Sequence, residues 1–156
     1  MDRMDRRILA ELQADGRLSV TELADKVGLS LSPCHRRVKT LEQNGVITGY
    51  RANLDPASMG YSFSAIVFVT LSVANRPAVS EFEEAVKDVP QIITAQRLFG
   101  DPDYMLQVVS RDLKSFQVLY DEKLSGMPGV QRLNTTLVMK TVVQDRPLPL
   151  LIDPAG

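Results

Sequence analysis

Residues 29–47, LSLSPCHRRVKTLEQNGVI, combine side chains that can donate hydrogen bonds with a spacing typical of an α-helix. Read at 100° per residue, one sector is apolar and the opposite sector is polar and locally positive. The apolar residues are Cys34, Val38 and Leu41, and the polar residues are Ser32, His35, Arg36, Lys39 and Gln43. Ser32 and Pro33 predict the N-cap and first position of this helix, and Gly45 predicts its end. Donors and positive charge on one helix face suit the major groove of DNA, and we expect the helix to bind there.

The same helix contains the only histidine and the only cysteine of the chain, His35 and Cys34. Neighbouring helical residues point about 100° apart, so the pair is a poor metal site, and the place of Cys34 on the apolar face predicts structural burial. A single cysteine also excludes an intramolecular disulfide. The sequence contains no nucleophile paired with a base, no glycine-rich phosphate loop and no paired carboxylates outside a turn. We therefore expect a non-enzymatic protein without catalytic residues, cofactor or metal.

A second polar cluster lies in the segment FGDPDY, residues 99–104. The carboxylates of Asp101 and Asp103 can hold an α-amino group, and the loop amides can hold an α-carboxylate, which together suit a zwitterion. Pro102 removes one backbone donor from this loop. Gly, Asp and Pro are also the ordinary residues of tight turns, so by itself the cluster is more typical of a plain turn.

Three short helices are predicted to position the polar face of residues 29–47. Asp2 caps a first helix of about a dozen residues. Ser19 and Glu22 have the spacing of a capping box, which starts a second helix that Gly28 ends. Only about three residues separate this helix from the next, which is too few for antiparallel packing and forces a steep crossing. The pattern predicts a helix-turn-helix.

A helix-turn-helix assigns roles to the exposed polar residues, because its last helix presents its N-terminal end to base edges. Residues 46–54, VITGYRANL, predict a short strand or wing beside this helix. The expected DNA contacts are Ser32 and His35 to bases, Lys39 and Arg51 to phosphates, and Arg36 to either bases or phosphates. Charges on an exposed helix face are solvated by default, so only the helix-turn-helix context favours this interpretation.

Composition and charge limit the class of protein without fixing its partner. With 156 residues and 44% hydrophobic residues, the chain can form one or two ordinary packed cores. Residues 1–53 carry nine Lys/Arg against seven Asp/Glu, a net +2, whereas residues 54–156 carry nine against twelve, a net −3. The charged N-terminus lacks the apolar run of a signal peptide, and the longest apolar stretch is too short to cross a bilayer. We expect a soluble cytoplasmic protein with no membrane partner.

The second half of the chain has a different periodicity. Residues 54–62 contain Pro and Gly and predict a linker, and residues 63–143 predict two successive strand–helix–strand units. This βαββαβ order is typical of a ferredoxin-like antiparallel sheet with both helices on one face, which makes the fold class α+β. The predicted strands are apolar on both faces, so we expect a homodimer to cover the free face. The proline-rich tail, residues 144–156, is expected to dock on a neighbour through Leu148, Leu150 and Leu151.

The order and spacing of many short motifs resemble the leucine-responsive regulatory protein/AsnC (Lrp/AsnC) family of bacterial and archaeal transcription regulators. In the N-terminal half the shared pattern is Asp2, Asp5, Ile8-Leu9, Gly16-Arg17, Glu22-Leu23-Ala24, Val27-Gly28-Leu29-Ser30, Arg37-Val38, Leu41-Glu42, Gly45-Val46-Ile47 and Gly49-Tyr50. In the C-terminal half it is Gly100-Asp101, Asp103-Tyr104 and Pro128-Gly129-Val130. The resemblance covers nearly the whole chain.

The resemblance implies a winged helix-turn-helix domain, residues 1–53, joined to a ferredoxin-like effector-binding and oligomerisation domain, residues 63–143. It further implies homodimers, often assembled into octamers, that respond to an amino acid or a related metabolite. The implied effector pocket lies near a junction between subunits, and its residues are Gly100, Asp101, Asp103, Tyr104 and Thr135. Leu133 departs from the family pattern, because it is apolar where a second polar residue is common.

Three functions remain open from the sequence. The leading hypothesis is a sequence-specific transcription regulator, whose dimer places two recognition helices about one DNA turn apart and whose activity responds to an amino acid. The alternative is an effector-independent architectural DNA-binding protein of the same fold. The third is an accessory regulatory subunit of an amino-acid biosynthetic enzyme, and the helix-turn-helix argues against it.

Overall fold

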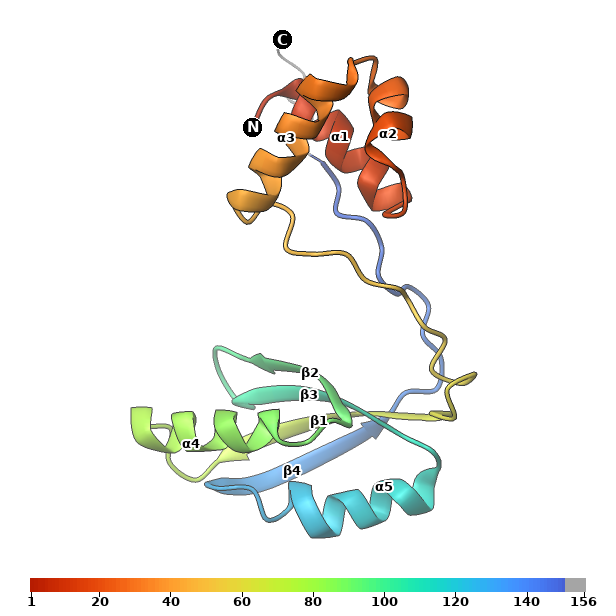
Figure 1. The fold of residues 1–156 in the computed structure, drawn as a ribbon. Coiled ribbons are helices and arrows are strands. Elements are labelled where there is room, and N and C mark those ends of the chain that lie inside the picture. The colour runs from red at the N-terminus through yellow and green to blue at the C-terminus, as the bar shows by residue number, and fades with distance from the viewer. Residues whose placement is uncertain (151–156) are drawn as a thin grey trace. The chain divides into compact units, whose positions relative to one another are not determined.

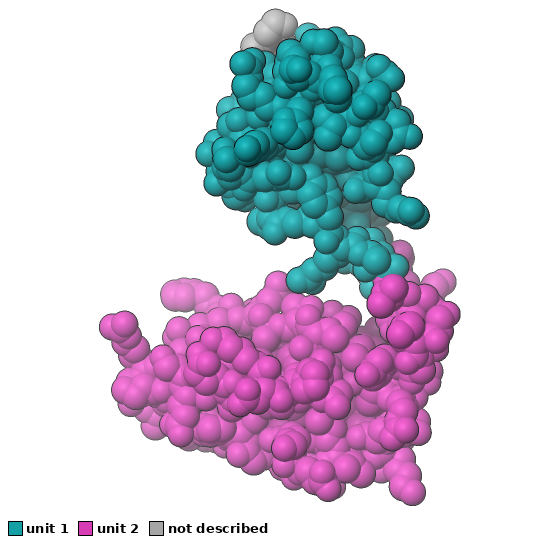
Figure 2. Space-filling view, viewed as in Figure 1, with its two compact units in different colours: residues 1–53, 143–156 teal, residues 54–142 magenta. Residues whose placement is uncertain are grey.

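The computed structural model describes residues 1–150, which divide into two units that are coloured separately in Figure 2. One unit contains residues 1–53 together with the chain from Val143 onward, and the other contains residues 54–142. The chain therefore leaves the N-terminal unit after Asn53 and returns to it at Val143. Among the described residues, no helix is both long and apolar enough to cross a membrane. The prediction for Leu151 lies outside the described residues.

Local capping defines the first two helices of the N-terminal unit, α1 (Arg3–Ala14) and α2 (Val20–Val27). The Asp2 side chain accepts a hydrogen bond from the Asp5 amide at 2.8 Å, and the Asp5 carboxylate accepts one from the Asp2 amide at 2.9 Å. Ser19 and Glu22 form the same reciprocal pair at the start of α2, as the sequence predicts. Gly28 ends α2 with φ of 74°, a left-handed conformation that favours glycine.

The third helix, α3 (Leu31–Gln43), starts earlier than the sequence analysis predicts. Its N-cap is Ser30 rather than Ser32, and no side chain caps it. Pro33 is consequently the third helical residue, where its missing N–H costs nothing because the first intrahelical bond comes from Cys34 to the Ser30 carbonyl. The turn after α2 closes through its own backbone, with the Leu29 amide on the Ala24 carbonyl at 2.9 Å, so the helix needs no cap to begin.

Of the short strand or wing predicted over residues 46–54, the strand is wrong, because the structure assigns no strand there. The amides of Val46 and Ile47 both donate to the Leu41 carbonyl, which holds the chain against the end of α3. Further along, the Tyr50 hydroxyl donates to the Glu42 carboxylate at 3.0 Å. These contacts hold residues 46–53, here called the wing segment, against α3, although the segment pairs with no strand.

The second unit is the predicted α+β, ferredoxin-like fold (Figure 1). Its elements are β1 (Phe63–Leu71), α4 (Arg76–Lys87), β2 (Ile92–Arg97), β3 (Tyr104–Ser110), α5 (Leu113–Leu119), the π-helical η1 (Tyr120–Leu124) and β4 (Val130–Leu137). All neighbouring strands are antiparallel, in the order β2-β3-β1-β4. Figure 1 shows α4 and α5 on the same side of this sheet, and residues from both helices join one apolar core with the strands.

Burial alternates along β1, so the two faces of the sheet are distinct. Ala65, Val67 and Val69 are fully buried toward the helices, whereas Ile66 and Phe68 are partly exposed on the helix-free face. The last strand is shorter than predicted, ending at Leu137 instead of Val143. Leu137 pairs with Ala65, which lies near the start of β1. After Leu137, the Val138 amide still donates to the Ser64 carbonyl, and the pairing of β4 with β1 ends there.

Candidate DNA-binding surface and ligand pocket

Burial divides α3 into the two faces that its sequence pattern predicts. Cys34, Val38 and Leu41 are buried in the core of the N-terminal unit, and burial raises the pKa of the Cys34 thiol, which keeps it unreactive. The polar residues Ser32, His35, Arg36 and Lys39 are all exposed, as is Arg51 on the wing segment. The structure thus brings the four helical candidates together on one surface.

Arg37 stands between these exposed cations but has a different role. Its Nη1 atom lies 2.7 Å from carboxylate oxygens of both Asp2 and Asp5, the two residues that cap α1. The hydrogen bond from the Asp5 amide and the Arg37 guanidinium hold the pKa of Asp2 below its usual value, and the carboxylates raise the pKa of Arg37. This ion pair joins the start of α1 to the middle of α3.

Leu31 is an exposed residue of α3 that the sequence pattern did not single out. It is the first residue of α3, and 51% of its surface is exposed although it lies next to the apolar sector. The later predicted helix start placed it in the preceding turn, so only a correct cap assignment would have found it. An apolar side chain at this end of a recognition helix can contact the methyl group of thymine.

The predicted effector loop is folded onto the sheet through Asp103. The Asp103 amide donates to the Val69 carbonyl at 2.9 Å, and its carboxylate accepts a hydrogen bond from the Leu71 amide at 2.7 Å. Gly100 has a φ of 132°, so only glycine fits this loop without strain. The carboxylate of Asp103 therefore serves the loop structure.

Two other residues of the loop differ sharply in exposure. Tyr104 is 3% exposed, and its hydroxyl donates to the Glu83 carboxylate of α4 at 2.8 Å. Burial, together with the negative charge of Glu83, raises the pKa of Tyr104 to about 12. Asp101, in contrast, is exposed and accepts a hydrogen bond from the Thr70 hydroxyl at 3.1 Å, with Arg132 at 3.4 Å. Asp101 is thus the carboxylate of the loop that is open to a ligand or a partner.

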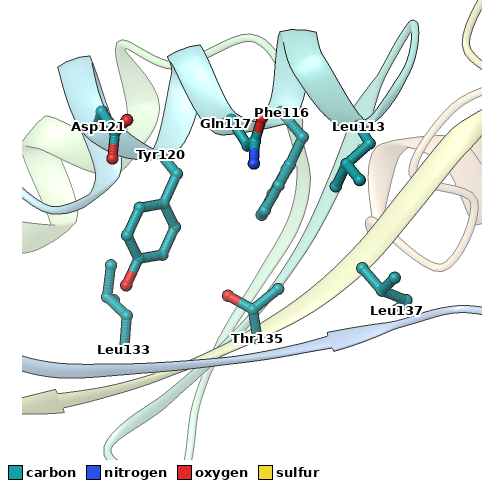
Figure 3. Close-up of a pocket in the computed structure, with 8 residues that line it drawn as sticks. All are labelled: Leu113, Phe116, Gln117, Tyr120, Asp121, Leu133, Thr135 and Leu137. Atoms are coloured by element: carbon teal, nitrogen blue, oxygen red, sulfur yellow. The ribbon is translucent and has the colours of Figure 1, made fainter.

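Thr135 lines a different site, a pocket of about 650 Å³ between α5, η1 and β4 (Figure 3). The rings of Phe116 and Tyr120 project from the helix toward β4, and Thr135 projects back from the strand. The hydroxyl oxygen of Thr135 is buried and has no hydrogen-bond partner among the described residues. The lining is half apolar and half polar, with Leu113, Phe116, Leu133 and Leu137 beside Gln117, Tyr120, Asp121 and Thr135. Such a lining suits a small amphipathic molecule.

Within one chain, the structure does not bring all the predicted effector residues together. Thr135 pairs with Val67 and shares its face toward the helices. Asp101 contacts Thr70 and Arg132, which lie on the helix-free face. Thr135 and Asp101 therefore belong to opposite faces of the same sheet.

The fold and these two sites define a class of protein, a DNA-binding helix-turn-helix joined to a small ligand-binding domain, and comparison with known proteins gives the same class. Residues 1–48 match the family model of the winged helix-turn-helix DNA-binding domain, and residues 64–148 match that of the Lrp/AsnC ligand-binding domain. The chain belongs to the Lrp/AsnC family of transcription regulators.

Individual relatives match along almost their entire length. The Bkd operon transcriptional regulator of Pseudomonas aeruginosa is 40% identical over 150 residues, which cover 96% of this chain and 98% of that protein. The leucine-responsive regulatory protein of Escherichia coli is 39% identical over 148 residues, covering 95% and 90%. A transcriptional regulator of Neisseria meningitidis, solved as a complex with L-Met, superposes with a TM-score of 0.91 at 34% identity and covers 97% of both chains.

Proposed function

We propose that this chain is a dimeric, sequence-specific transcription regulator whose DNA binding or assembly responds to an amino acid or a related small metabolite. The observation that carries the proposal is the exposed polar face of α3 within a helix-turn-helix. Binding rather than catalysis is its mode of action, and the compartment is the one that holds the DNA, which in a bacterium is the cytoplasm. We propose residues 1–53 as the DNA-binding domain, 54–62 as linker, 63–143 as the effector and oligomerisation domain and 144–156 as tail.

On DNA, the N-terminal end of α3 enters the major groove. Ser32, His35 and Arg36 read base edges, and Leu31 contacts a thymine methyl beside them. Lys39 and Arg51 contact phosphates, so the affinity falls steeply as salt concentration rises. The net +2 of residues 1–53 is modest. A dimer that holds two such helices about one DNA turn apart therefore supplies much of the affinity and favours pseudo-palindromic sites.

The helix-free face of the sheet is the proposed dimer interface. It presents partly exposed apolar side chains in the middle of the sheet, Ile66, Phe68 and Met105. Burying them against the same face of a second copy removes apolar area from water, and a two-fold axis makes the face self-complementary. Further contacts between dimers would build the octamer.

The effector site is proposed to form between copies of the chain. The pocket beside α5 supplies apolar walls for a ligand side chain and the unpartnered Thr135 hydroxyl for a polar group. The loop at Gly100 and Asp101, supported by Asp103 and Tyr104, comes from a neighbouring copy and holds the amino group. The opposite faces of Asp101 and Thr135 favour this shared site, since one chain alone does not complete it. The four apolar residues of the pocket, Leu133 among them, favour an amino acid with an apolar side chain, as in the relative bound to L-Met.

The first test concerns DNA. We expect Arg36→Ala to lower specific affinity for the upstream DNA of its own gene on the order of 100-fold, since a bidentate arginine–guanine contact contributes up to about 3 kcal/mol. Mobility shifts measure the affinity, and size-exclusion chromatography shows that the oligomer is unchanged. The matched control is Arg76→Ala, an exposed arginine at the start of α4. Wild-type affinity in the Arg36 variant would overturn the proposed recognition surface.

The second test separates the regulator from the architectural alternative. Thermal melts with each amino acid at millimolar concentration should show stabilisation by one of them, about 2.7 kcal/mol at a hundredfold excess over Kd. An unchanged melting temperature with all amino acids would favour the effector-independent DNA-binding protein.

A further inference from the structure

The last described residues of the chain lie on the DNA-binding unit and not on the sheet. Residues 143–150, here called the tail segment, reach the end of α1. Leu148 and Leu150 form one wall of a groove, and its other walls come from the end of α1 and from the wing segment, residues 46–53. The sequence pattern predicts that Leu148 and Leu150 dock on a neighbour, whereas in the structure both contact their own chain.

The side chain of Gln13, in α1, forms hydrogen bonds with the backbone of the tail segment. Its Oε1 atom accepts a hydrogen bond from the Leu148 amide at 2.7 Å, and its Nε2 atom donates to the Leu148 carbonyl at 3.2 Å. Leu148 is flanked by Pro147 and Pro149, which have no amide N–H. Within Pro-Leu-Pro only one N–H exists, and Gln13 binds it. The prolines also hold the segment extended, which lowers the entropy lost on docking.

Leu148 and Leu150 contribute to the contact of the tail segment with the helices in different ways. Leu148 is 75% exposed, so α1 binds its backbone and not its side chain. Leu150 is partly buried and packs against the core that α1, α2 and α3 share. The contact therefore consists of one amide pair and one apolar anchor two residues further along.

We infer that the end of α1 is the docking site of this chain's own C-terminal segment, and that docking completes the DNA-binding unit by closing the groove opposite the wing segment, which holds the wing segment in place. The docked segment lines the same groove as Tyr50 and Arg51, and Arg51 is a proposed phosphate contact. The segment follows β4, the strand that carries Thr135, by only a few residues. The effect on DNA rests on the proposed function, whereas the docking itself does not.

Hydrogen exchange tests the docking directly. In the full-length protein, we expect the Leu148 amide to be protected, and Gln13→Met, which removes both hydrogen bonds at similar volume, to speed its exchange about tenfold. The matched control, Gln131→Met on the exposed start of β4, should leave the Leu148 amide unchanged. Equal exchange in the wild type and in Gln13→Met overturns the docking, whether or not the protein binds DNA.

Truncation tests the consequence. A chain ending at Val142, and separately Leu150→Ala in the full-length chain, should weaken DNA binding about tenfold while leaving stabilisation by the effector, which reports on the other unit, intact. Unchanged DNA affinity in both variants overturns the role of the segment in the DNA-binding unit. If the wild type itself binds no DNA, the proposed function fails, and hydrogen exchange still decides the docking.

Discussion

The two candidate sites are built in opposite ways. The proposed DNA-binding surface comes mainly from one helix, α3, whose exposed residues share a face through helical periodicity, and Arg51 of the wing segment adds to it. The proposed effector residues come from a loop and a distant strand, and within one chain they occupy opposite faces of a sheet. The first surface is therefore complete within one chain, whereas the second site, as proposed, needs another copy of the chain.

The first prediction concerns the loop of the proposed effector site, in which Asp101 and Asp103 have different roles. We expect Asp103→Ala to lower the free energy of unfolding by about 2 kcal/mol, because it leaves the amide of the buried Leu71 without its charged acceptor. Asp101→Ala should leave stability nearly unchanged, because its contacts are exposed, but should abolish stabilisation by the effector. Chemical denaturation with and without effector measures both. Similar stability losses in the two variants would contradict the division of roles.

Residues close in the sequence were predictable, and residues brought together by tertiary structure were not. The Asp2 cap of α1, the capping box of α2 and the apolar stripe of α3 depend on residues close in the sequence, so the sequence predicts them correctly. The ion pair of Arg37 with Asp2 spans 35 residues, and no spacing rule indicates it. The same applies to the separation of Thr135 from Asp101, since it depends on strand register. The start of α3 was misplaced because Ser30 and Ser32 are equally good caps by type.

A second prediction tests whether the pocket beside α5 binds a ligand or is only a gap in the packing. Thr135→Val keeps the shape of the side chain and removes a buried hydroxyl that has no hydrogen-bond partner within residues 1–150. The free protein should therefore become more stable by about 1 kcal/mol, since an unsatisfied polar group is lost. Stabilisation by the effector should fall in the same variant, as thermal melts with ligand would show. Thr141→Val, at an exposed position outside β4, is the control. If Thr135→Val destabilises the ligand-free protein, the Thr135 hydroxyl already has a hydrogen-bond partner in solution and is not free to bind a ligand.

A third prediction concerns the DNA-binding side of the comparison. If Leu31 contacts a thymine methyl, replacing that thymine by uracil should weaken wild-type binding about fourfold. This factor corresponds to roughly 0.8 kcal/mol, the free energy gained by burying one methyl-sized group. Leu31→Ala should bind the thymine and uracil sites with equal affinity. Scanning each thymine of the operator by mobility shift measures this coupling. A Leu31→Ala protein that still discriminates at every position where the wild type does would remove Leu31 from the recognition surface.

The last prediction, whose effect is absent at neutral pH, tests how the loop is anchored to α4. In the folded protein the Tyr104 phenol stays neutral up to a pKa of about 12, whereas in the unfolded chain it ionises near 10. Between these values the unfolded state releases a proton that the folded state keeps, so stability falls as pH rises through this window and is fully present below it. Tyr104→Phe lacks this ionisation, and its stability relative to the wild type should therefore improve as the pH rises above about 10. Urea denaturation of both proteins at stepped pH measures the difference. Parallel stability curves would mean that Tyr104 ionises normally and that its contact with Glu83 does not hold the loop, which would leave Asp103 as the anchor of the loop to the sheet.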